Sequence, residues 1–241
     1  MLEKVEPEKK DLSTYRPVVG DEAINEIETL AEPLQGARVV HVNATAFGGG
    51  VAEMLQTLVP LMRDAGLDAE WRVIEGADDF FDVTKACHNG LQGADVEFTD
   101  EMKEIWKTYN KKNAQAFEGE YDFVIMHDPQ PAGLRHYHEG GDARWIWRCH
   151  IDTSEPNPDF WDFFAPFINE HDAGGITLQI IDGETGFLVD SAEQCADRMQ
   201  HLLEHPEEAD RMGTAGRERV RENFLSSRHL ADYLQLFNAL S

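Results

Sequence analysis

The sequence is poor in basic side chains and has no long apolar segment. It contains 21 Lys and Arg against 46 Asp and Glu, which gives a formal net charge of −25 over 241 residues. A surface this acidic repels other polyanions, so we expect no nucleic acid and no anionic lipid as a partner. No run of about 18 apolar residues occurs, and the sequence therefore predicts no membrane-spanning helix.

Cysteine is scarce, and its placement does not indicate a metal site. Cys87, Cys149 and Cys195 are odd in number and lack the spacing of metal ligands, and no Asp-rich loop repeats along the chain. The first residues lack the apolar core of a signal peptide. We therefore interpret the three cysteines as reduced thiols of a cytoplasmic protein without a bound metal.

The acidic residues are spread along the whole chain rather than held in one tail. This distribution favours a halophilic protein, whose self-repulsion is screened by dense salt. The alternative is an ordinary acidic cytosolic protein. The halophilic interpretation predicts that transfer from dilute buffer to molar KCl raises the melting temperature by several degrees. For a chain of this size, a gain of ~2 kcal/mol in the free energy of unfolding raises the melting temperature by roughly 5 °C. Equal melting temperatures in thermal scans of the two solutions would count against it.

Apolar patterning alternates between the strand and the helix period, which predicts an α/β fold with a doubly wound, mostly parallel, Rossmann-like sheet. We expect residues 1–172 to form the Rossmann-like domain and residues 173–241, with one short strand and three helices, to lean on it or on a partner chain. Residues 1–20 are expected to form an arm or an irregular lead-in. The strands are predicted at 39–43, 68–75, 121–127 and 144–151, and residues 182–189 are predicted to be a turn that leads into a short strand. The helices are predicted at 21–34, 51–65 (with Pro60 implying a kink or restart), 80–91, 99–117, 157–170, 191–204, 206–222 and 225–240.

The most informative stretch is the first strand–turn–helix corner, where a Val-rich strand meets three glycines. Gly48, Gly49 and Gly50 allow positive φ and close approach of a ligand to the backbone. The following helix would direct its free N–H groups at that turn, which favours a phosphate or sugar oxygens. A glycine corner that only saves space is an equally good interpretation. The spacing is not GxGxxG, which argues against a Rossmann oxidoreductase.

Polar side chains follow the predicted strands, at the edge where such sheets bind ligands. They predict a polar pocket for a hydroxyl-rich ligand, with Trp71 or Trp147 as an apolar wall. Each residue also has a structural interpretation, such as a hydrogen-bonded histidine at a strand end or a solvated helix face. The candidates after the strands are Asn43, Thr45, Glu75, His127, Asp128, His150 and Asp152, and Lys85, His88 and Asn89 lie on the next predicted helix.

Four motifs, in order, resemble those of the glycosyltransferring trehalose synthases, a retaining GT-B group within glycosyltransferase family 4. They are the glycine corner from Asn43 to Leu55, Phe81–Lys85 with His88–Gly93, His127–Pro131, and Arg148–Ser154. The resemblance covers nearly all of residues 10–172, and the Asp182–Val189 segment with the terminal helices also resembles the end of that family.

The resemblance implies transfer of glucose from a nucleotide-diphosphate glucose to glucose, with retention and without a metal or resident cofactor. Gly48–Gly50 would lie near the donor phosphates and the acceptor, and His88, Asn89 and Gln92 on the acceptor side. His150 would approach the transferred sugar and Asp128 the acceptor region, which makes these two the catalytic candidates. The last helix, near 225–240, would cross back onto the first domain.

The chain departs from the family between Asp172 and Gly174, where most of a second Rossmann domain is absent. The family's Arg/Lys pair for the donor diphosphate and its Glu-x7-Glu segment are absent with it. Because a leaving diphosphate needs cations, we expect an impaired or partner-dependent glycosyltransferase in which the nucleotide sugar is an uncertain ligand. The alternative is a non-catalytic module that binds glucose or another small sugar. Apolar faces left without a partner domain favour a homodimer.

Overall fold

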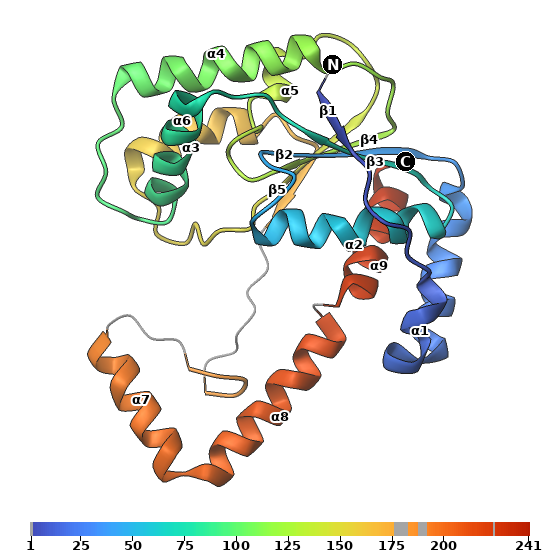
Figure 1. The fold of residues 1–241 in the computed structure, drawn as a ribbon, viewed down its shortest axis with the longest axis vertical. Helices are drawn as coiled ribbons and strands as arrows, with labels where there is room; N and C mark the ends of the chain where they lie inside the picture. The colour runs from blue at the N-terminus through green and yellow to red at the C-terminus, as the bar shows by residue number, and fades with distance from the viewer. Residues whose placement is uncertain (1, 176–182, 188–191, 224) are drawn as a thin grey trace.

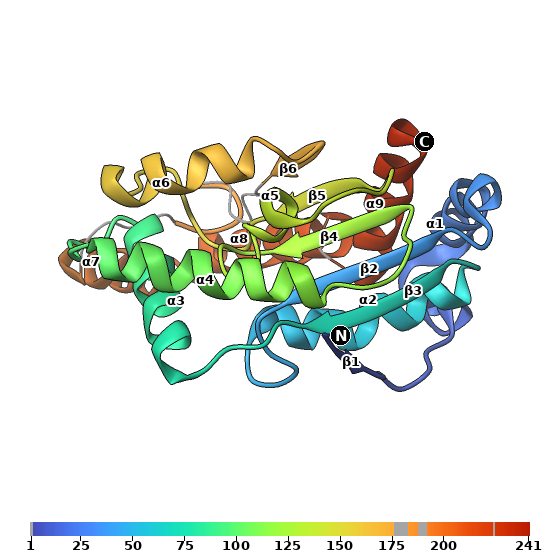
Figure 2. The same cartoon turned by 90° about the horizontal axis from the view of Figure 1, so that it is seen from above.

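The computed structural model describes residues 2–175, 183–187, 192–223 and 225–241. Its centre is one six-stranded sheet in the order β1-β3-β2-β4-β5-β6, parallel except for the antiparallel β1–β3 pair. Figure 2 shows β3, β2, β4 and β5 side by side. The predicted α/β class with a mostly parallel sheet is confirmed. The strands are β1 Glu3–Val5, β2 Arg38–Asn43, β3 Asp68–Val73, β4 Phe123–His127, β5 Arg144–Arg148 and β6 Ala173–Gly175.

Helices cover both faces of the sheet, and each face has its own apolar core. In Figure 1, α1, α2 and α9 lie below the sheet and α4 and α5 lie above it, and α3 and α6 pack into the same apolar core as α4. None of the described helices is long and apolar enough to cross a membrane. The bounds are α1 Arg16–Ala31, α2 Gly50–Asp64, α3 Asp78–Leu91, α4 Asp100–Ala116, α5 Leu134–Tyr137, α6 Pro158–Ile168, α7 Ala192–Glu204, α8 Pro206–Asn223 and α9 Ser226–Leu240, with 3-10 turns at Leu12–Tyr15 and Glu32–Leu34.

Strand β2 runs through the middle of the sheet, between β3 and β4, and is buried on both faces. Its side chains alternate in the way that a strand requires. Val39 packs into the core beneath α2 and α9, and Val40 and Val42 pack into the core beneath α3, α4 and α6. His41 is also fully buried in this strand. The carboxyl end of β2 therefore places the glycine corner at the same edge of the sheet as the carboxyl ends of β4 and β5.

Two local predictions were wrong, those for the N-terminal arm and for a restart at Pro60. The N-terminal arm is not wholly irregular, because residues 3–5 form β1 on the edge of β3. The helix predicted to begin at Asp21 is confirmed, because Gly20 (φ 84°, ψ 169°) divides α1 at a kink into a short turn before it and the main helix after it. Helix α2 is a single helix across Pro60, so the expected restart does not occur. Of the turn and short strand predicted over residues 182–189, the turn is seen at residues 183–186, where Gly183 N–H donates to the carbonyl oxygen of Gly186, and residues 188–189 lie outside the described part of the chain.

The C-terminal helix α9 returns to the first domain, as predicted. Phe237 is fully buried and stacks on Phe123 of β4, with ring centroids 4.2 Å apart. The side-chain amide of Asn238 donates to the carbonyl oxygen of Leu30 (2.8 Å). By contrast, α7 and α8 project away from the sheet (Figure 1). A division of the chain at residue 172 stays a prediction.

Candidate functional site

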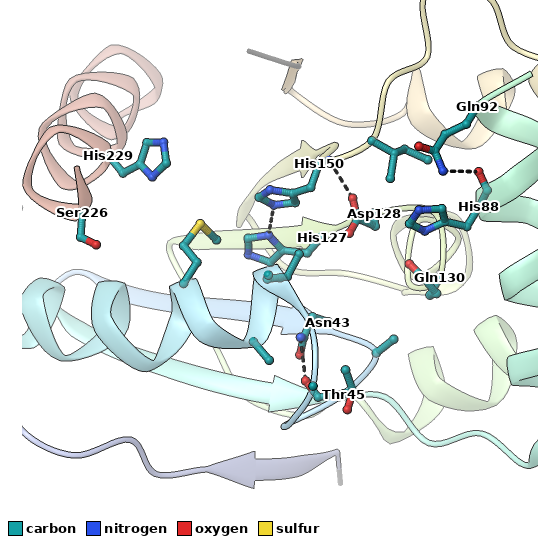
Figure 3. A pocket seen from close by; sticks show the side chains of 18 residues that line it. Asn43, Thr45, His88, Gln92, His127, Asp128, Gln130, His150, Ser226 and His229 are labelled. Atoms are coloured by element: carbon teal, nitrogen blue, oxygen red, sulfur yellow. Dashed lines mark hydrogen bonds between the residues drawn. The ribbon is translucent and has the colours of Figure 1, made fainter. Parts of the chain in front are cut away.

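A cavity of about 740 Å³ opens above the carboxyl ends of β2, β4 and β5. Sites for small molecules commonly measure ~300–1,000 Å³, so this one is large enough for a sugar. In Figure 3, Ser226 and His229 of α9 lie on one side of the cavity. His88 of α3 and Gln92, which directly follows that helix, lie on the other side. The cavity is lined by Asn43, Ala44, Thr45, Gly48, Gly49, Gly50, Val51, Ala52, Met54, His88, Gln92, His127, Asp128, Gln130, His150, Ile151, Ser226 and His229.

The glycine corner forms one wall of the cavity. Gly48 and Gly49 have φ angles of 68° and 152°, and a Cβ on either would meet nothing within 4 Å. Glycine is therefore favoured there by backbone conformation and not by crowding. Helix α2 begins at Gly50 without a side-chain cap. Its first N–H groups and positive dipole end face the cavity, an arrangement that favours ligand oxygens.

Asp128 occupies a strained position directly after β4. It is the single described non-glycine residue with positive φ (64°), and its Oδ1 accepts a hydrogen bond from the backbone N–H of His150 (2.7 Å). Burial raises the pKa of the Asp128 carboxyl to about 6, against the opposing effects of the His150 N–H and the Arg148 charge. A carboxyl that titrates near neutral pH suits a group that accepts or returns a proton.

His150 is joined to two deeper histidines. Its Nε2 lies 2.9 Å from Nδ1 of His127, and Nε2 of His127 lies 2.9 Å from Nδ1 of His41. Burial, followed by the charge of Arg148, lowers the pKa of His150 to about 4. Because both ring nitrogens of His127 already have partners, neither is free to form a hydrogen bond with a ligand.

Two tryptophans that were expected to form an apolar wall instead support the site from within the core. Trp71 is fully buried and its Nε1 donates to Oδ1 of Asn43 (2.8 Å). Trp147 is 4% exposed and its Nε1 donates to the carbonyl oxygen of Asp128 (3.0 Å). The wall prediction was wrong because the two indoles are buried in the apolar cores on opposite faces of the sheet and neither lines the cavity. Asn43 also donates to the carbonyl oxygen of Thr45 (2.8 Å), so it shapes the glycine corner.

The structure gathers most, but not all, of the predicted site residues. Lys85 and Asn89 are exposed on α3, Asp152 is exposed after β5, and none of the three lines the cavity. Glu75 borders a neighbouring depression. The cavity brings together Asn43, Thr45, Gly48, Gly49, Gly50, His88, Gln92, His127, Asp128 and His150.

The sequence analysis missed Gln130 and the two residues that α9 contributes, Ser226 and His229. Gln130 stands in the quoted His127–Pro131 motif, a signal that was available. For Ser226 and His229 the available hint was the expected return of the last helix, which does not say which residues face the site.

The cavity has little positive charge. Among its lining residues, all of which the structure describes, there is no Lys or Arg. No group of three or more His, Cys, Asp or Glu in the described part of the chain could hold a metal ion. Cys87 and Cys149 are buried free thiols, and burial raises their pKa values to about 12 and about 11. The site thus offers neutral hydrogen-bonding groups, one carboxyl and a helix N-terminus.

Comparison with known proteins identifies relatives of both parts of the chain. Residues 41–180 match the family described as trehalose synthase, N-terminal domain, and residues 173–235 match a family described as glycosyl transferase-like. The trehalose synthase of Rubrobacter xylanophilus is 52% identical over 184 residues, which is 74% of this chain and 44% of that protein. The trehalose synthase of Thermococcus litoralis is 52% identical over 167 residues, 68% of this chain and 40% of that protein.

A solved structure, the α,α-trehalose 6-phosphate synthase of Burkholderia multivorans, aligns with a TM-score of 0.40 and 14% identity, over 69% of this chain and 44% of that one. The chain spans less than half the length of the curated relatives that it matches.

Proposed function

The chain belongs to the trehalose synthase N-terminal domain family, and from this membership we propose that its cavity binds glucose or a similar small sugar as the acceptor side of a glycosyltransferase. The observation that carries the proposal is the convergence of the capless α2 N-terminus, His88, Asp128 and His150 on one polar cavity. Neutral imidazoles and backbone N–H groups suit the hydroxyls of a sugar.

In the reaction, glucose would be transferred with retention from a nucleotide-diphosphate glucose to the bound glucose, without a metal or resident cofactor. Asp128, with a pKa of about 6, is the group suited to exchange a proton with the acceptor hydroxyl. His150 would approach the transferred sugar during the reaction, and because it lines the cavity it would contact glucose bound there in the absence of a donor. Lys85, Asn89 and Asp152 remain candidates only for a ligand that extends beyond the cavity. A cytoplasmic location suits the free thiols.

Glucose binding is testable by one variant pair on α3. His88→Ala is expected to weaken the affinity for glucose roughly tenfold, because it removes one hydrogen bond at a half-buried site. Isothermal titration of glucose into the protein in molar KCl measures this. Asp82→Ala, on an exposed position of the same helix, is the control and should leave the affinity unchanged. Equal affinities for His88→Ala and the parent protein would contradict the acceptor site.

A non-catalytic sugar-binding module is the second candidate, and one observation favours it. The cavity lining has no cation to stabilise a leaving diphosphate. The two functions separate when nucleotide-diphosphate glucose and glucose are added together. If trehalose forms in the calorimeter cell, the result supports the transferase, with a donor site completed across chains. If glucose binds but the donor does not bind and no product forms, the result supports the module.

A second copy of the chain is the partner that we propose. Met199 and Leu203 on α7 and Val220 on α8 are 62%, 83% and 49% exposed, on the two helices that project from the sheet. Burial of such side chains against a symmetry mate would lower the free energy of the assembly. Light scattering in molar KCl distinguishes a dimer from a monomer.

A further inference from the structure

The three histidines beneath the cavity form one continuous row that ends at a sulfur atom. His41 in β2, His127 in β4 and His150 after β5 are nearly parallel rings, with interplanar angles of 23° and 24°. Two N–N contacts of 2.9 Å connect them. At the inner end, Nε2 of His41 lies 3.3 Å from Sδ of Met62 in α2. At the outer end, His150 lines the cavity, and its Nδ1 has no hydrogen-bond partner among the described residues.

All three rings are expected to be neutral at physiological pH. Burial lowers the pKa of His41 to about 3 and that of His127 well below its ordinary value, and Arg148 adds to the effect at His127 and His150. His229 on α9 and Asp128 also border the outer end of the row. A neutral imidazole has one N–H donor and one acceptor nitrogen. The N–H bonds of the row must therefore all point the same way, either inward to Met62 or outward to the cavity.

Met62 distinguishes these two arrangements. A thioether sulfur is a weak acceptor and has no hydrogen to donate. With the row pointing inward, His41 Nε2–H donates to this sulfur, whereas with the row pointing outward a ring lone pair faces the sulfur lone pairs at 3.3 Å. His41 and Met62 are both fully buried, so no solvent replaces the missing donor.

We propose that Met62, acting through His41 and His127, holds the proton of His150 on Nε2 and so presents Nδ1 to the cavity as a hydrogen-bond acceptor. This inference rests on the proposed function in one respect, namely that the group received there is a hydroxyl of the bound sugar. A ligand oxygen that cannot donate, such as that of a phosphate ester, is rejected at this point. The row does not conduct protons, because the sulfur at its end cannot take one. Met62 and His41 are positioning residues.

The first test reads the protons directly in the free protein and needs no ligand. In ¹⁵N-histidine-labelled protein at pH 7, long-range ¹⁵N–¹H correlation should show His41, His127 and His150 with a protonated Nε2 and a bare Nδ1. A protonated Nδ1 on His150 would overturn the proposal. Met62→Leu keeps the side-chain volume but removes the acceptor, so it should move the row toward the Nδ1–H form or a mixture.

Met126→Leu is the matched control, because Met126 is buried in β4 but faces the opposite core. It should leave the spectra of the three histidines unchanged. A Met62→Leu protein whose histidines all keep the Nε2 proton would show that Met62 does not set the row. If the variant does not fold, the spectrum of the parent protein still decides the direction of the row.

The second test asks what His150 accepts. Among monodeoxyfluoro-glucoses, in which one hydroxyl is replaced by fluorine, one analogue should bind at least tenfold more weakly than glucose, because fluorine cannot donate to Nδ1. The penalty should disappear in Met62→Leu to the extent that the row reverses. If glucose binds and none of the analogues binds at least tenfold more weakly, the acceptor role of His150 is refuted. If the row points inward but glucose does not bind, the proposed function is refuted and the inference about the row stands.

Discussion

Replacing Phe237 by Ala is expected to lower the free energy of unfolding by about 3–5 kcal/mol, the usual cost of removing a fully buried phenyl ring. Phe237 packs face to face on Phe123, with an interplanar angle of 18°, and also contacts Tyr233 (centroids 5.7 Å apart). It has no exposed surface. The loss is measured by urea unfolding in molar KCl, followed by tryptophan fluorescence.

The same substitution should also weaken the proposed binding of a sugar, because α9 carries Ser226 and His229 to the cavity. A single helix of 15 residues is barely stable in water, so its place depends on tertiary packing. Gln235→Ala is the matched control. Gln235 is exposed two positions earlier and makes one surface hydrogen bond to Glu26, so its loss should change stability by no more than ~0.5 kcal/mol. A cost below ~1 kcal/mol for Phe237→Ala would mean that α9 does not pack on the sheet.

The glycine corner could be predicted from sequence because all of its determinants are local. A Val-rich strand, three glycines and an apolar periodicity of 3.6 lie within about 25 consecutive residues and specify β2, the turn and α2. Strand β1 could not be predicted in this way. Glu3, Lys4 and Val5 carry no strand pattern of their own, and they are extended because they pair with Val73, Arg72 and Trp71 of β3.

The candidate site was only partly predictable for a related reason. Residues at the strand ends could be predicted to converge, since parallel strands share an edge. The residues from α9 could not, because Ser226 lies almost at the other end of the chain. His41 was missed because it stands inside a strand rather than at its end, so nothing in the local pattern marks it as a site residue. Its partner His127 is 86 positions away in the sequence.

Acidification from pH 7 to pH 5 is expected to lower the free energy of unfolding by roughly 4 kcal/mol through four groups, His41, His127, His150 and Asp128. His41, His127 and His150 have folded-state pKa values far below 6.5. Their contribution is complete above pH 6.5 and is lost as the pH falls toward those values, because the unfolded chain takes up protons that the folded chain excludes. Asp128 opposes them by roughly 1 kcal/mol, since a pKa raised to about 6 favours the folded state as the pH falls.

The slope of stability against pH isolates one member of the row. In His41→Phe, the slope at pH 5–6 should be smaller by about 1.4 kcal/mol per pH unit, which corresponds to one proton. The variant should also be less stable at every pH, because Nε2 of His127 loses its partner, but that loss does not alter the slope. Ile125 of β4 is paired with His41, and Ile125→Val changes packing there without removing a titrating group. The slope of this control should therefore equal that of the parent protein. Urea titrations at fixed KCl concentration measure all three proteins, and since the row is buried, salt should screen it weakly. An unchanged slope in His41→Phe would mean that His41 is protonated alike in the folded and unfolded chains, and then the row could not hold a single direction.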